Sequence, residues 1–148
     1  MKDHTYLRAY IAGVFLPTLV FPVLITALAV GRYVCGMQFP VERIVIFPLA
    51  FMPALWGLWN VLWVALRRIA HPPLGLHGAI LPFLILPLGA TLARHLDVIS
   101  FGPSSVTWFG AISIPYALIA CGFVFALVLY YLVWKYIIGF VNRELGIL

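Results

Sequence analysis

The chain has 148 residues, of which 65% are hydrophobic and only 9% are Asp, Glu, Lys or Arg, and its mean hydropathy is +1.12. A soluble domain typically carries about 25% charged residues, so this composition leaves too little polar surface for a water-soluble fold. The formal net charge is +5. In so apolar a chain we interpret that charge as a determinant of membrane topology and expect no nucleic-acid partner.

Four long apolar stretches take up most of the chain. They cover residues 7–30, 44–66, 74–93 and 109–138. Each is about as long as a helix needs to cross a bilayer core of about 30 Å. The sequence therefore predicts an all-α, polytopic integral membrane protein, a four-transmembrane-helix bundle that forms a single domain over residues 1–148. We expect it to lie in a lipid bilayer, the bacterial inner membrane.

The basic residues predict which ends of the helices face the cytoplasm. If the chain starts inside, the inner segments hold Lys2, Arg8, Arg67, Arg68, Lys135 and Arg143, and the outer segments hold Arg32, Arg43 and Arg94. This distribution follows the positive-inside rule, so both termini are predicted to be cytoplasmic. The basic start of the first stretch also resembles a signal peptide, but its apolar run is longer than a signal core, which favours a retained helix.

A segment with two prolines five residues apart recurs in the first three stretches, and a copy with one proline occurs in the fourth. The prolines are Pro17 and Pro22, Pro48 and Pro53, Pro82 and Pro87, and Pro115. The recurrence fits either an internal repeat or chance similarity between apolar segments. Proline frees the carbonyl four residues earlier, so we expect kinked helices with free carbonyls at Thr18, Leu49 and Phe83.

The second stretch contains the clearest candidate site. At 100° per residue, Trp56, Asn60, Trp63 and Arg67 share one face of a helix. An asparagine amide in hydrocarbon must find a partner, which is either a neighbouring helix or a bound ligand. Aromatic faces with one polar group suit lipophilic or cationic ligands, so Trp56, Asn60 and Trp63 are candidate ligand-facing residues.

A basic cluster follows the same stretch at its inner end. It consists of Arg67, Arg68 and His71. Two interpretations are open: contact with an anionic lipid headgroup or phosphate, and charge that serves only to orient the protein in the membrane.

The sequence predicts no cofactor, no metal and no enzymatic activity. Haem ligation needs two histidines at similar depth, whereas His71 and His77 lie near the inner face and His95 near the outer one. His95 and Asp97 are too few ligands for zinc. The outer loop contains Ser, His and Asp but lacks the G-x-S-x-G pattern of a hydrolase.

The apolar stretches also lack the membrane-embedded carboxylate that proton-coupled pumps commonly use. We therefore predict a small transporter or channel-like protein for a lipophilic or cationic solute. Because four helices enclose little space, it would act as a homo-oligomer, most simply a symmetric dimer. The alternative is a non-catalytic accessory or assembly subunit of a larger membrane complex, which would require no polar site.

Overall fold

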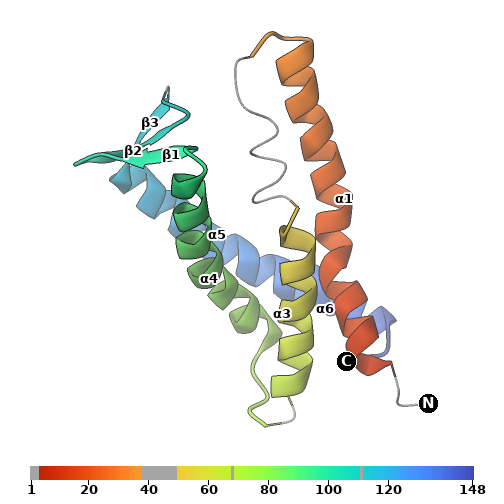
Figure 1. Cartoon of the computed structure of the whole chain (residues 1–148). Helices are drawn as coiled ribbons and strands as arrows, with labels where there is room; N and C mark the ends of the chain where they lie inside the picture. The colour runs from red at the N-terminus through yellow and green to blue at the C-terminus, as the bar shows by residue number, and fades with distance from the viewer. Residues whose placement is uncertain (1–3, 38–49, 68, 111) are drawn as a thin grey trace.

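The computed structural model describes residues 4–37, 50–67, 69–110 and 112–148 and is mostly helical (Figure 1). In chain order the elements are α1 (Thr5–Tyr33), α3 (Met52–Leu66), α4 (Leu74–His95), β1 (Ile99–Phe101), β2 (Ser105–Trp108), β3 (Ile112–Pro115), α5 (Tyr116–Leu132), η2 (Val133–Ile138) and α6 (Gly139–Glu144). The π-helical turn η2 joins α5 to α6, so a continuous helical segment forms the C-terminal part of the chain.

Among the residues that the structure describes, three helical segments are long and apolar enough to cross a membrane: Thr5–Tyr33, Leu74–His95 and Tyr116–Glu144. They correspond to the predicted first, third and fourth spans. The predicted second span corresponds to α3, an apolar helix of 15 residues. The remainder of that span, residues 44–49, lies outside the described residues.

A small antiparallel sheet replaces the predicted start of the fourth helix. The sequence predicts a helix from residue 109, but the helix begins at Tyr116 and the preceding residues form β3. The sheet has the order β1-β2-β3. Its strands are rich in β-branched residues, and the backbone at Pro115 is extended with ψ of 144°, which sets the boundary between strand and helix.

The prolines occupy two different kinds of position, which corrects the expectation of a mid-span kink at Pro53. Pro17 and Pro22 lie inside α1, and Pro82 and Pro87 lie inside α4. Pro53 lies in the first turn of α3, where the missing N–H costs little. Pro115 precedes α5 and is not part of a helix. Pro48 and Leu49 lie outside the described residues.

The helices form two pairs that meet at one end. Helix α1 packs mainly against α3, and α4 packs mainly against α5 and η2. Figure 1 shows α4 and the α1–α3 pair approaching at the lower end and diverging towards the sheet. Both chain ends lie at the lower end, where the Arg8 guanidinium donates to the Leu145 carbonyl at 3.5 Å.

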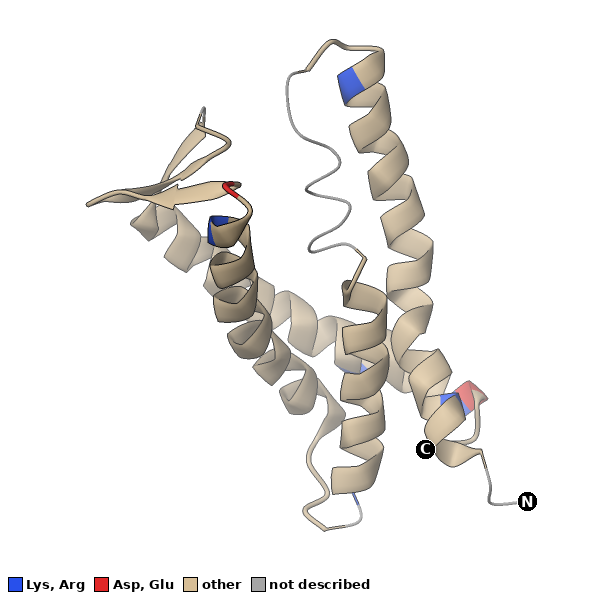
Figure 2. Ribbon diagram, in the orientation of Figure 1, with Lys and Arg blue, Asp and Glu red and all other residues tan. Residues whose placement is uncertain are grey.

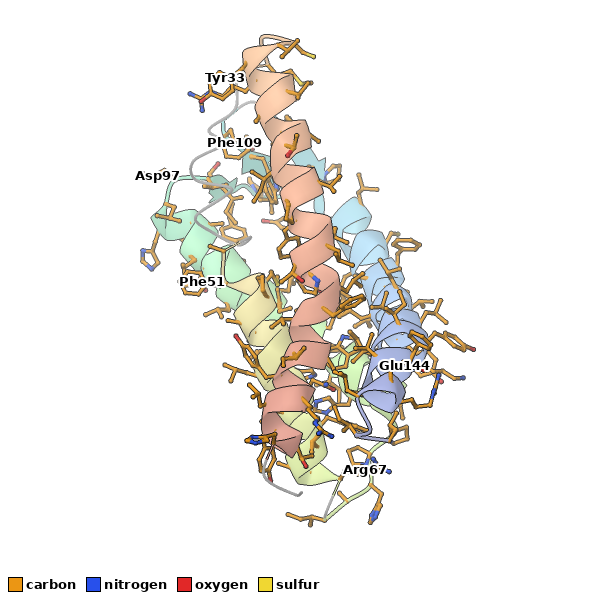
Figure 3. All side chains as sticks on the ribbon, turned by 90° about the vertical axis from the view of Figure 1, so that its right-hand side faces the viewer. Tyr33, Phe51, Arg67, Asp97, Phe109 and Glu144 are labelled. Atoms are coloured by element: carbon orange, nitrogen blue, oxygen red, sulfur yellow. The ribbon has the colours of Figure 1, made fainter. Side chains whose placement is uncertain are left out.

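Most charged residues lie near the helix ends, and α1 and α4 have long uncharged middle sections (Figure 2). In Figure 3, Arg67 and Glu144 lie towards one end of the molecule and Tyr33, Asp97 and Phe109 towards the other. Large apolar side chains between them are exposed, for example Val23 at 69% and Phe125 at 68%. Apolar surface on this scale is suited to a lipid environment.

Candidate functional site

The three candidate site residues on α3 lie on its buried face. Trp56, Asn60 and Trp63 are all buried, and Asn60 has no exposed surface. Trp63 donates its indole N–H to the Pro72 carbonyl at 2.9 Å. This bond ties α3 to the turn that leads into α4. The face that the sequence predicts is therefore an interior surface between helices.

Asn60 is paired with a second buried amide. Its side-chain N–H groups donate to the Ala9 carbonyl of α1 and to Oδ1 of Asn142 in α6, both at 2.8 Å. Asn142 donates back to Oδ1 of Asn60 at 3.2 Å. The two asparagines of the chain thus satisfy one another and join three helices. These contacts are those of an interhelical hydrogen bond, one of the two roles that the sequence leaves open for Asn60.

Trp56 belongs to an aromatic cluster in the core of the bundle. Its ring lies 5.2 Å from that of Tyr130 and 5.6 Å from that of Trp134, centroid to centroid. Trp134 is fully buried, and its indole N–H finds no acceptor among the described residues. The Trp134 ring packs directly on Gly78 of α4, where a Cβ atom would overlap it. A residue larger than glycine at position 78 would therefore displace this ring.

A reciprocal contact between Trp59 and His77 connects α3 to α4. The Trp59 indole donates to the His77 carbonyl at 2.9 Å, and Nε2 of His77 lies 2.9 Å from the Trp59 carbonyl. Because a carbonyl only accepts, Nε2 must carry the proton. The two rings also stack at 4.6 Å. We call this pair the Trp59–His77 clasp.

Breaking either half of the clasp is expected to destabilise the contact between α3 and α4. His77→Phe keeps an aromatic ring for stacking but removes the Nε2 hydrogen bond, and Trp59→Phe removes the indole donor. Each variant should lose about 1 kcal/mol of stability, measured as thermal unfolding in detergent. Trp108→Phe, in a half-exposed strand position, is the control and should unfold like the wild type. Unchanged unfolding of both clasp variants would contradict a stabilising role.

Two residues of the predicted basic cluster, Arg67 and His71, belong to the described part of the chain. Arg67 donates to the Ile147 carbonyl at 2.9 Å, and its guanidinium lies 5.4 Å from the centroid of the Trp63 ring. It therefore holds the C-terminal residues against the end of α3. His71 is exposed and adopts a positive φ of 46°, and Arg68 lies outside the described residues.

An apolar groove lies between the diverging parts of α3 and α4. It has a volume of about 310 Å³, at the lower end of the range for small-molecule sites. Its walls are the apolar side chains Phe51, Met52, Ala54, Leu55, Leu58, Ile85, Leu88 and Leu92. Phe51, labelled in Figure 3, lies at the start of α3. Such a lining offers dispersion contacts and no polar recognition.

Other reactive side chains are dispersed. Within residues 4–37, 50–67, 69–110 and 112–148, no group of three or more His, Cys, Asp or Glu residues could hold a metal ion. Cys35 and Cys121 are both free and exposed. The hydroxyls of Thr26 and Thr91 donate to carbonyls of their own helices, at Pro22 and Pro87, each at 2.8 Å.

The chain was compared with protein-family models, with curated proteins and with solved structures, and none of them matches it.

Sequence patterns alone do not single out two of the residues that build this interior. Asn142 follows the apolar stretch near a charged C-terminus, where a solvated side chain is the ordinary expectation. Trp134 lies among interfacial aromatics and resembles one of them. The one available signal is that Asn60 and Asn142 are the two asparagines of an apolar chain, because an amide in lipid requires a partner.

Proposed function

We propose that this protein is a small multi-pass membrane protein that takes a lipophilic solute from the bilayer into the groove between α3 and α4 and carries it as a transporter. The observation that supports this function most directly is the groove itself, whose eight wall residues are all apolar. A solute dissolved in the bilayer could enter such a site laterally. The described wall residues of the groove include no carboxylate, so the groove supports a solute with an uncharged apolar part, such as an acyl chain, better than a cationic one.

Some wall residues of the groove also pack against the buried core of the bundle. Met52, Leu55 and Ile85 line the groove and also pack on the core cluster that contains Trp56 and Trp134. The Trp59–His77 clasp joins α3 to α4 further along the same pair of helices. The clasp therefore fixes one end of the pair, while the groove forms where the helices separate.

Filling the groove tests the proposal. The variant Ala54→Trp places an indole among the wall residues, and Ala126→Trp on α5 is the matched control away from the groove. A diazirine-bearing palmitate in phosphatidylcholine vesicles is the probe, and cross-linked peptides are mapped by mass spectrometry. Ala54→Trp should reduce labelling of the groove peptides about tenfold, whereas Ala126→Trp should not. If excess unlabelled palmitate does not reduce labelling of the wild-type protein, the result contradicts a specific site.

Transport is measured separately from binding. Dithionite bleaching of NBD-labelled phosphatidylcholine reports movement of an acyl-chain-bearing solute between leaflets of the same vesicles. Wild type and Ala126→Trp should speed the loss of inner-leaflet fluorescence, and Ala54→Trp should not. Saturable labelling without any movement would retain the groove as a binding site and reject the transport function.

The proposed placement in the membrane is a bacterial inner membrane with both termini in the cytoplasm. Its support is the charge distribution. Arg8 and Arg67 contact the C-terminal residues Leu145 and Ile147, and Lys135 and Arg143 belong to η2 and α6, the last elements of the chain. Arg32 and Arg94 lie in the last turns of α1 and α4, at the opposite ends of those helices. In this proposal the chain keeps four crossings, and α3 belongs to the second of them. Cysteine labelling from each side of the membrane tests this topology, and an external C-terminus would contradict it.

The alternative function is that of a non-catalytic accessory subunit, and one observation favours it. Every residue of α5 is exposed or half-buried, so the surface of this helix that does not pack on α4 is open to lipid or to another membrane helix. A Cβ atom added at Gly122, near its middle, would meet nothing within 4 Å. A homo-oligomer would use the same surface. Native mass spectrometry from lipid nanodiscs distinguishes a monomer, a homo-oligomer and a complex with another subunit.

A further inference from the structure

The small sheet has one polar face and one apolar face. The register pairs Ser100 with Thr107 and Thr107 with Ser113, so these three side chains share a face. Ser105 belongs to the same face, because its hydroxyl accepts a hydrogen bond from that of Ser113 at 2.8 Å. The opposite face carries the side chains at the alternate positions, namely Ile99, Phe101, Val106, Trp108, Ile112 and Ile114.

The apolar face is only partly covered by protein. Ile99 and Val106 are buried and, with Val98, form a cluster packed by Ala90 and Ala93 of α4 and by Ile119 of α5. Phe101, Trp108 and Ile112 share the face but lie outside this cluster, with exposed fractions of 48%, 39% and 60%. The face that turns towards the helices thus continues beyond them as an exposed apolar rim.

The chain fixes the sheet at the ends of two candidate spans. Strand β1 follows the end of α4 after three residues, and β3 ends at Pro115, immediately before α5. Tyr116 also donates its hydroxyl to the Gly102 carbonyl at 2.8 Å, which ties the β1–β2 turn to the start of α5. If α4 and α5 cross a bilayer, the sheet must lie at the level of the lipid headgroups, where exposed Trp and Phe side chains are most stable.

We propose that the sheet is an interfacial membrane anchor: its rim of Phe101, Trp108 and Ile112 inserts among phospholipids of the outer leaflet, and its serine and threonine face points to water. Arg94 supports this placement, because its guanidinium carbon lies 5.9 Å from the centroid of the Phe101 ring and could extend to a lipid phosphate. The proposal rests on the membrane placement of α4 and α5 given above, and it does not depend on the groove or on transport.

Neighbouring residues on opposite faces of β3 provide a matched test. In a background with Cys35→Ser and Cys121→Ser, single cysteines replace Ile112, Ser113 or Phe125 and are labelled with NBD in phosphatidylcholine–phosphatidylglycerol vesicles. NBD at position 112 should emit at a shorter wavelength than NBD at position 113. It should also be quenched by a lipid spin label near the headgroup and be shielded from iodide. NBD at position 113 should be quenched by iodide. Position 125 lies about 14 Å along α5 and reports the membrane interior.

Each contrary result has a distinct meaning. If positions 112 and 113 are equally accessible to iodide while 125 is quenched by deep lipid labels, the sheet lies in water and the proposal is overturned, with the span intact. If 125 is also accessible to iodide, the membrane placement itself fails. If 112 is shielded from both quenchers, protein and not lipid covers the rim. The pair Trp108→Cys and Thr107→Cys repeats the comparison on β2 if a β3 variant does not fold.

Discussion

The variant Gly13→Val is expected to separate α1 from α3 and to prevent stable folding. A Cβ atom at Gly13 would lie 2.5 Å from the Trp56 carbonyl oxygen and 2.8 Å from Cα of Gly57. Both are backbone atoms of α3, so no side-chain rotation can relieve the overlap. Overpacking costs about 1–3 kcal/mol where side chains can adjust, and a backbone clash should exceed that range. Thermal unfolding and the yield of monodisperse protein in detergent measure the effect.

Gly122→Val is the matched control for this variant. It makes the same chemical change in an equally apolar helix, at a position where an added Cβ meets nothing within 4 Å. It should change stability by less than about 0.5 kcal/mol. Gly57→Val, which would clash with the ring of Tyr10, provides a second test of the same helix contact. Equal stability of the Gly13 and Gly122 variants would show that α1 and α3 are not packed at Gly13.

The long helices and the buried face of α3 could be predicted from sequence, because both depend on local composition. Uninterrupted apolar runs require backbone hydrogen bonds within the segment, which selects helices. The spacing of Trp56, Asn60 and Trp63 places them on one face of any helix. The residues that this face contacts, such as Ala9 and Asn142, are distant from α3 in the sequence. The helical period of α3 carries no information about them.

The sheet could not be predicted from the sequence, and the reason is a different one. Residues 109–115 are apolar enough to extend the fourth stretch, and hydropathy does not distinguish a buried helix from a strand. The deciding factors are pairings between segments, such as Val106 with Ile114, and the extended backbone of Pro115. The effect of each proline was similarly ambiguous. Pro53 lies in the first turn of a helix and Pro87 lies inside one, although both occupy the second proline position of the recurring segment.

Removing the buried amide pair is expected to give a strongly non-additive pattern of stabilities. Asn60→Leu leaves the Asn142 amide without its partner and removes the bond to the Ala9 carbonyl; Asn142→Leu leaves Asn60 with Ala9 alone. Each single variant should lose about 1–3 kcal/mol, because a buried polar group is left unpaired. In the double variant both amides are gone, and the loss should be smaller than the sum by about 1 kcal/mol. Thermal unfolding of the four proteins in one detergent measures this coupling.

The same four proteins distinguish a structural Asn60 from one that contacts a solute. If the amide only joins helices, a folded Asn60→Leu/Asn142→Leu protein should keep the competable palmitate labelling of the α3–α4 groove. Asn142→Leu alone should not affect labelling except through stability. If the double variant unfolds like the wild type but loses labelling, Asn60 contacts the solute directly. Additive losses of stability would contradict the pairing of the two asparagines, and the helix junction would then depend on apolar packing around Gly13.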